Sequence, residues 1–187
     1  MFYNNLLNEV VSKMNDRPVL KYVYQNPNNG EWVASDGYIM LIEHNEAVPM
    51  FELWDPKTGN PINEDLQYYD YKHLFTEDYE IFNGKINHQK DGLTKLGDVN
   101  IPTKYYNTAC KFIGPDHNIK ISSRAVYMYN ESKSRQAFVI NVHHNYKFKV
   151  MDVNGEVINT FDTWQEAEDF AAIMGNNFTV RALPWLQ

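Results

Sequence analysis

Side chains suited to catalysis or metal binding are few in this sequence. Cys110 is the only cysteine, and it lies on the apolar stripe of a predicted helix, which favours a buried structural thiol over a nucleophile. His143 and His144 are adjacent, and neighbouring residues of a strand point to opposite faces, so the pair is poorly placed for one metal ion. The sequence has no glycine-rich phosphate loop, G-x-S-x-G motif or H-E-x-x-H motif. We therefore expect a non-enzyme without metal or cofactor.

Charged side chains are unevenly distributed. Residues 43–80 carry ten acids and two lysines, whereas residues 81–145 have a net charge of +5 in a chain of net charge −7. A basic stretch beside an acidic one is compatible with a face that binds nucleic acid, and also with charges that the fold simply mixes. A catalytic carboxylate pair in the acidic stretch is a further interpretation, although carboxylates in such loops are usually solvated. Its candidates are Asp55, Glu64, Asp65, Asp70, Glu77 and Asp78.

The elements that position these residues follow from apolar spacing and turn signals. A first helix is predicted from apolar residues at helical spacing, namely Leu6, Leu7, Val10, Val11 and Met14. Pro18 disfavours helix in the residue before it. Strands are predicted over 19–24, 31–34 and 38–43, with turns at 26–30 and 55–61.

A similar order of elements returns in the second half. Pro102 is predicted to open a second helix that Gly114-Pro115 ends, and Lys104, Asn107 and Lys111 share its polar face. Three predicted strands follow, over 118–122, 125–129 and 137–142. Helix-then-strands thus occurs twice, which predicts an α+β fold with antiparallel sheet.

The last 42 residues predict a separate small unit. Asn154-Gly155 is a strong hairpin signal between strands over 147–153 and 156–161. Thr163 and Glu166 form a capping-box pattern at the start of a helix to Met174, and a closing strand is predicted over 178–183. We expect this helix to cover the face of the hairpin with Trp164 and Phe170 as anchors, and we expect the whole unit to dock on the main domain or on a second copy.

One segment resembles a known family. The run from Trp32 to Leu41, and within it Ala34-Ser35-Asp36-Gly37, is similar to the signature of bacterial DNA polymerase processivity clamps, in which Ala-Thr-Asp-Gly is followed by His or Tyr and Arg-Leu. Further segments resemble clamp elements in the same order: Arg17-Pro18-Val19-Leu20, Gln67-Tyr68-Tyr69-Asp70-Tyr71, Ile101 to Tyr106, and Ala137 to Val142. The family's arginine is replaced by Ile39.

The resemblance implies a fold and a DNA contact. It implies one sliding-clamp-like domain over residues 1–145, with two helices packed on antiparallel sheet and related by an approximate twofold. Residues 146–187 are then a β-hairpin, α, β appendage. Helices line the hole of the family's rings, so the residues implied to face duplex DNA are Asn8, Lys13, Lys104, Asn107 and Lys111.

Three functions are compatible with the sequence. The first is a non-catalytic DNA-replication accessory protein, with duplex DNA or replication proteins as partners. The second is a phage-type protein-interaction module or inhibitor that uses a clamp-like fold to bind a host protein. The third is an enzyme, which a close pair of buried ionisable groups in a cleft would favour. We expect a cytoplasmic phage or prophage product without a membrane partner. A homo-oligomer is a further possibility, and a ring built from this chain would need about six copies.

Overall fold

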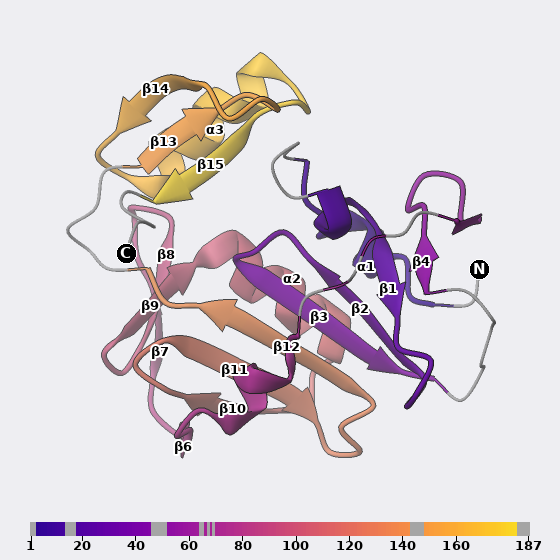
Figure 1. Ribbon diagram of the computed structural model, residues 1–187. Helices are drawn as coiled ribbons and strands as arrows, with labels where there is room; N and C mark the ends of the chain where they lie inside the picture. Colours follow the sequence, from indigo (N-terminus) through magenta and orange to yellow (C-terminus); the bar gives the residue numbers. More distant parts are fainter. Residues whose placement is uncertain are drawn as a thin grey trace.

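The computed structural model describes residues 3–13, 18–45, 52–63, 66, 68, 70–142 and 148–182. These residues form antiparallel sheets with helices packed against them, which confirms the predicted mixed α+β class (Figure 1). None of the helices in these ranges has the length and apolarity that crossing a bilayer requires.

The largest layer is a nine-stranded antiparallel sheet within the described residues. Its spatial order is β5 (Pro61–Ile62), β4 (Leu53–Trp54), β1 (Val23–Gln25), β2 (Glu31–Ser35), β3 (Ile39–His44), β12 (Arg135–Ile140), β11 (Ala125–Asn130), β10 (His117–Ile121) and β6 (Glu80–Ile81). In both halves the chain runs from an outer strand toward the centre, through β1, β2 and β3 and then through β10, β11 and β12. The two halves meet where β3 pairs with β12.

Helix α2 (Thr103–Ile113) packs on one face of this sheet. Its apolar stripe is buried, as the spacing predicts: Tyr105, Tyr106, Ala109, Phe112 and Ile113. Gly114 ends the helix, with its N–H donating to the Cys110 carbonyl. A smaller sheet of β7 (Ile86–His88), β8 (Leu93–Leu96) and β9 (Val99–Pro102) leads directly into α2. The opposite face of the main sheet is covered partly by 3₁₀ turns η1 (Pro18–Lys21) and η2 (Lys72–Thr76), whose Leu20 and Leu74 join a second apolar cluster.

The first helix is much shorter than its apolar spacing predicts. Helix α1 spans only Leu6–Glu9, and the predicted continuation through Val10 and Val11 is wrong. The Ser12 N–H donates to the Leu20 carbonyl at 2.7 Å instead of extending the helix. Two β-branched valines and a serine propagate a helix poorly, so this long-range bond prevails. Met14 lies outside the described residues.

The strand predicted over 19–24 is also corrected. Its first part is the 3₁₀ turn η1, and extended structure begins only at Val23. Pro18 fixes φ near the value that a first helical position needs, so it starts a turn here rather than a strand.

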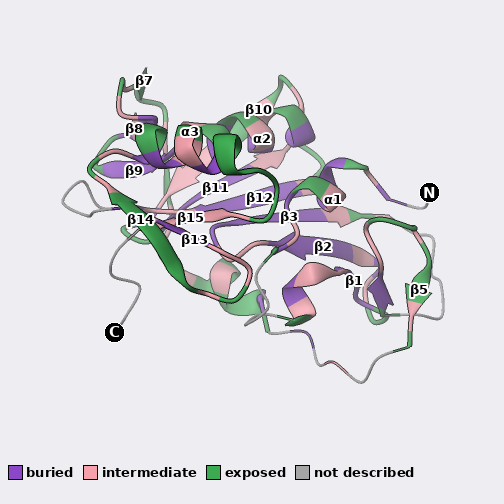
Figure 2. Ribbon diagram, turned by 90° about the horizontal axis from the view of Figure 1, so that it is seen from above, coloured by how far each residue is buried: buried purple, intermediate pink, exposed green. Residues whose placement is uncertain are grey.

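The C-terminal residues form the predicted hairpin, helix and strand. Strands β13 (Phe148–Met151), β14 (Val157–Phe161) and β15 (Thr179–Ala182) make one sheet, and α3 (Trp164–Met174) covers it. Both bonds of the capping box between Thr163 and Glu166 are present. In Figure 1 this unit, coloured orange to yellow, sits above β9 and α2, and Figure 2 shows the outward side of α3 exposed.

Candidate nucleic-acid interface

Helix α2 presents a basic and polar face to solvent. Lys104, Asn107 and Lys111 are all exposed and lie three and four residues apart. No residue of α2 is acidic. The helix is held by its buried opposite face, so these three side chains have a rigid support.

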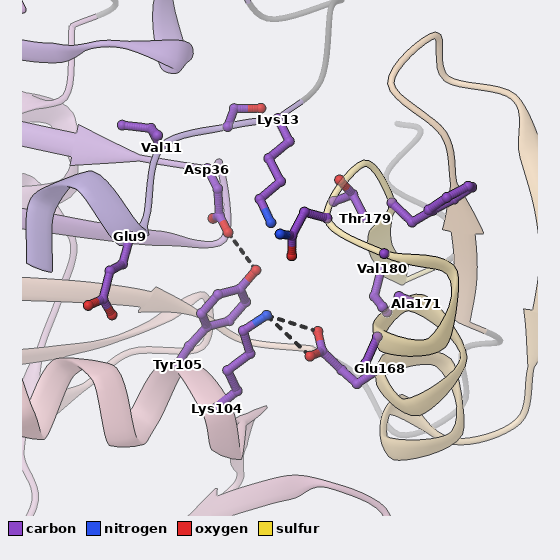
Figure 3. A pocket seen from close by; sticks show the side chains of 15 residues that line it. Glu9, Val11, Lys13, Asp36, Lys104, Tyr105, Glu168, Ala171, Thr179 and Val180 are labelled. Atoms are coloured by element: carbon purple, nitrogen blue, oxygen red, sulfur yellow. Dashed lines mark hydrogen bonds and ion pairs between the residues drawn. The ribbon is translucent and has the colours of Figure 1, made fainter. Parts of the chain in front are cut away.

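Two of the predicted lysines reach the same cleft. Lys13, which follows α1, and Lys104, in the first turn of α2, line a cavity of about 240 Å³ (Figure 3). The other residues predicted to contact DNA are not part of its lining. Asn8 is half-buried and accepts a hydrogen bond from the Tyr3 hydroxyl at 3.0 Å, whereas the two remaining α2 residues lie farther along the helix.

Helix α3 forms a further wall of the cleft and contributes an acidic side chain, Glu168, to its lining. Glu168 forms an ion pair with Lys104, at 3.1 Å between Oε2 and Nζ. The Lys104 side chain keeps 58% of its surface exposed and Glu168 keeps 24%. A pair this exposed contributes at most about 1 kcal/mol to stability. Glu168 was not among the predicted site residues, because it is 64 positions from its partner and no local pattern joins the two.

The clamp-like motif, Ala34-Ser35-Asp36-Gly37, lies beside this cleft and contributes Asp36 to its lining. Ala34 is fully buried in β2, and the Ser35 hydroxyl oxygen accepts the N–H of Gly37 at 3.0 Å. Gly37 has φ of 94°, a conformation that favours glycine. Asp36 Oδ1 accepts the N–H groups of Tyr38 and Ile39, at 2.9 and 3.1 Å. The motif therefore shapes a tight β2–β3 turn.

Asp36 also ties this turn to α2. Its Oδ2 accepts the Tyr105 hydroxyl at 2.5 Å. Burial raises the pKa of Asp36, and its hydrogen bonds and Lys104 act in the opposite direction. Burial and the neighbouring carboxylate hold the pKa of Tyr105 well above its usual value, so that the hydroxyl remains a donor. A close pair of buried ionisable groups thus lines the cleft, but the carboxylate is already engaged by three donors that fix the fold.

Ile39 follows the turn, at the place where the clamp signature that this segment resembles has an arginine. It is 1% exposed and belongs to the main apolar core, so this position presents no side chain to DNA.

Trp164 is the anchor of the C-terminal unit, as predicted. It is 1% exposed, and its ring centroid lies 5.9 Å from that of Tyr38 and 6.0 Å from that of Tyr105. Phe170, the second predicted anchor, is half-buried and contacts Phe161 within the unit itself. The C-terminal unit therefore packs directly on the clamp-like motif and the start of α2.

An apolar pocket lies on the other side of the motif. Its volume is about 270 Å³, and it is bounded by η1, the β2–β3 turn, η2 and β12. The lining residues are Leu20, Ser35, Gly37, Tyr38, Ile39, Met40, His73, Leu74, Phe138 and Ile140. Four separate chain segments build it, which is why spacing along the sequence does not reveal it.

Cys110 is less buried than its place on the apolar stripe predicts. It is half-buried at the edge of the core, and its Sγ lies 3.9 Å from His117 Nε2. The other ring nitrogen of His117 lies 2.9 Å from the Gly114 carbonyl oxygen. Burial raises the pKa of the Cys110 thiol, which keeps it protonated near neutral pH.

The remaining candidate ligands and acids are dispersed. The described residues contain no group of three or more His, Cys, Asp or Glu side chains arranged for a metal. Asp55 accepts the N–H of Lys57 in a turn, and Glu77 pairs with Arg124 at 3.3 Å. His143, His144, Glu64 and Asp65 lie outside the described residues.

Comparisons with known proteins give weak similarities. No family model matches the sequence, and no curated protein matches it. A structure of DNA polymerase III subunit beta from Borrelia burgdorferi, in complex with a natural product, is 10% identical, with a TM-score of 0.21, over 79% of this chain and 32% of that one. A DNA polymerase sliding clamp from Bacillus subtilis is 14% identical, with a TM-score of 0.22, over 95% of this chain and 45% of that one.

This chain thus spans about a third to under half of the length of those clamp chains. TM-scores of this size do not establish a shared fold.

Proposed function

We propose that this chain is a non-catalytic DNA-replication accessory protein that contacts the phosphate backbone of duplex DNA with the exposed face of α2. The observation that carries the proposal is the charge of that helix, which exposes Lys104, Asn107 and Lys111 and has no acidic residue. Lysine and amide side chains bind phosphates without reading sequence. Lys13, on the opposite wall of the cleft, adds a third cation.

Three lysines fix the expected salt dependence. Each neutralised phosphate contributes a slope of about −0.9 to log K against log salt, so three contacts give about −2.7. Affinity then falls about 40-fold between 50 and 200 mM salt. One copy binds weakly on this basis, and stable retention on DNA requires several copies or a partner protein.

The test is fluorescence anisotropy with labelled duplex DNA at those two salt concentrations. The double variant Lys104→Glu with Lys111→Glu is expected to lose most of the binding and most of the salt slope. Its matched control is Lys57→Glu with Lys72→Glu, which changes the net charge equally at two exposed lysines of the acidic stretch. Equal losses in both double variants, or no salt-dependent binding of the wild type even at high concentration, would contradict direct DNA binding through α2.

The proposed architecture has a clamp-like domain over residues 1–145 and an appendage over residues 146–187. Its support is the strand order, in which each half of the chain runs from an outer strand to the central β3–β12 pair. We propose an approximate twofold axis at that pair, relating α1 with the first strands to α2 with the second. Helix α1, with one turn, is the shortened counterpart of α2.

A protein-interaction module or inhibitor is the second candidate function. The apolar pocket beside the motif favours it, because small pockets lined by Leu, Met and Phe accept apolar side chains of a partner. A host protein or a replication protein is the proposed partner in this case. Wild-type protein that shows no salt-dependent DNA binding would favour this candidate over the first.

The remaining expectations are part of the same proposal. A reducing cytoplasmic location agrees with a single cysteine, which cannot form a disulfide within the chain. A phage or prophage origin and a homo-oligomeric assembly remain predictions. Light scattering of the wild-type protein in solution distinguishes a monomer, a dimer and a ring.

A further inference from the structure

We propose that α3 is a built-in competitor of DNA: its carboxylate Glu168 occupies Lys104, the cation at the start of α2, and thereby weakens the binding of phosphate there. This inference rests on the proposed function, because it concerns the same face of α2. It gives the C-terminal unit a function. The resemblance to clamps covers only residues 1–145 and implies no function for that unit.

The first observation is the opposite charge of the two helices. Helix α2 contains two lysines and no acid, whereas α3 contains Glu166, Glu168 and Asp169 and no base. Of these acids, Glu168 contacts α2 directly, with both carboxylate oxygens within 3.3 Å of Lys104 Nζ. In Figure 3 the two side chains point toward one another across the cleft. A carboxylate at this place presents to Lys104 the same chemistry that a DNA phosphate would present.

The second observation is that the position of α3 is fixed by other contacts. Trp164 is buried against the clamp-like motif and the start of α2. The Gln165 N–H donates to the Asp91 carbonyl at 3.2 Å, beside Gly92. Gly92 has φ of 82°, and a Cβ there would lie 3.1 Å from the Gln165 nitrogen, so the backbone conformation and the close approach both favour glycine. Glu168 is therefore held near Lys104 by packing, and the ion pair does not have to order the unit by itself.

The third observation is where the contact lies on α2. Lys104 is in the first turn, and the preceding Pro102 provides no side-chain cap. Anions are favoured near the N-terminal turn of a helix by the helix dipole. The other charged groups of the cleft are Glu9, Lys13 and Asp36, and Asp36 is engaged by the β2–β3 turn and Tyr105. Glu168 is thus the acid of the cleft wall that is directly paired with a lysine proposed to bind DNA.

The size of the expected effect follows from exposure. The Lys104 side chain keeps 58% of its surface open to solvent, so the pair is a surface ion pair of modest strength. Removing Glu168 is therefore expected to raise DNA affinity about two- to fivefold rather than by orders of magnitude. The competitor attenuates binding and does not abolish it.

The experiment compares two single charge removals on the same helix of the full chain. Glu168→Gln removes the carboxylate that contacts Lys104. Asp169→Asn removes the adjacent carboxylate, which is exposed and accepts a hydrogen bond from the Gln165 side chain, an interaction that the asparagine oxygen preserves. Both variants change the net charge by one, so any general electrostatic effect is shared. Each is also combined with Lys104→Gln, and all are titrated against labelled duplex DNA at 50 mM salt.

The expected result is a two- to fivefold gain for Glu168→Gln, a clearly smaller gain for Asp169→Asn, and no gain from Glu168→Gln once Lys104 is glutamine. Equal gains in the two single variants, or a gain that survives Lys104→Gln, would overturn the competitor while leaving DNA binding intact. Absence of binding in every variant would overturn both proposals.

Discussion

Replacing Tyr105 by phenylalanine removes one oxygen and tests how the clamp-like motif is joined to α2. The hydroxyl donates to Asp36 at 2.5 Å, and the N–H groups of Tyr38 and Ile39 supply the other two donors. A hydrogen bond to a charged acceptor contributes about 1.5–3 kcal/mol to stability. We therefore expect Tyr105→Phe to lower the free energy of unfolding by about 2 kcal/mol. With a urea m-value of about 2 kcal/mol per M, the midpoint falls by about 1 M.

The assay is urea unfolding followed by circular dichroism, with Tyr106→Phe as the matched control. Tyr106 is the next residue of the same helix and is also buried, but its hydroxyl interacts with the uncharged Cys110 thiol. Its removal is expected to cost less than half as much. Combining Tyr105→Phe with Asp36→Asn measures the coupling between the two side chains. A coupling free energy near zero, or equal losses at the two tyrosines, would refute the idea that this bond joins the motif to α2.

The same variant has a defined pH dependence. Burial raises the folded-state pKa of Asp36 above its ordinary value of 3.8, and the Tyr105 hydrogen bond lowers it again. A carboxyl group with a raised folded pKa favours folding fully below its unfolded pKa, and this contribution is lost as pH rises through the folded pKa. Removing the hydroxyl raises the folded pKa further. The cost of Tyr105→Phe is therefore expected to be larger at pH 7 than at pH 4.

Two further predictions concern the C-terminal unit. Trp164→Ala should lower the free energy of unfolding by about 3–5 kcal/mol, because it removes a fully buried indole between the C-terminal unit and the rest of the fold. Urea unfolding measures this change, and a loss below about 1 kcal/mol would contradict the docking. Thr163→Ala should lower the free energy of unfolding by about 1 kcal/mol, because it removes the side-chain cap of α3. Thr160→Ala, at an exposed strand position, is the control and should lower it much less. Equal losses in thermal unfolding would argue against the capping box.

The element order of the C-terminal unit was predictable because its signals are local, although the hairpin loop spans residues 153–155 and is one residue longer than the predicted Asn154-Gly155 turn. The Asn154-Gly155 turn, the capping box at Thr163 and the closing strand each depend on residues within a few positions of one another. The first helix was not, because its end is decided by the bond between Ser12 and Leu20. Apolar spacing marks which residues are buried, but it does not tell how far a weak helix continues once a distant carbonyl competes for its N–H groups.

The candidate interface shows the same division. The exposure of Lys104, Asn107 and Lys111 follows from helical spacing alone, and the structure agrees. The partner of Lys104 could not be predicted, because Glu168 is 64 positions away and α3 packs on a different sheet, so no local pattern joins the two residues. In the sequence, the residues around Asp36 indicate only a resemblance to a family signature. Its physical role, a turn fixed by three donors, depends on Tyr105, which is 69 positions away.

The central pairing of the main sheet has a consequence for how the chain folds. Ile39 of β3 pairs with Val139 of β12, so this contact closes a loop of about 100 residues. The β2–β3 and β11–β12 hairpins, by contrast, close over short turns. Closing a long loop lowers the chain entropy before the contacts between its ends have formed. We therefore expect the two hairpins to form early and the pairing of β3 with β12 to limit the folding rate. A chain arrested before that step would expose two unpaired apolar strand edges, the state from which aggregation begins.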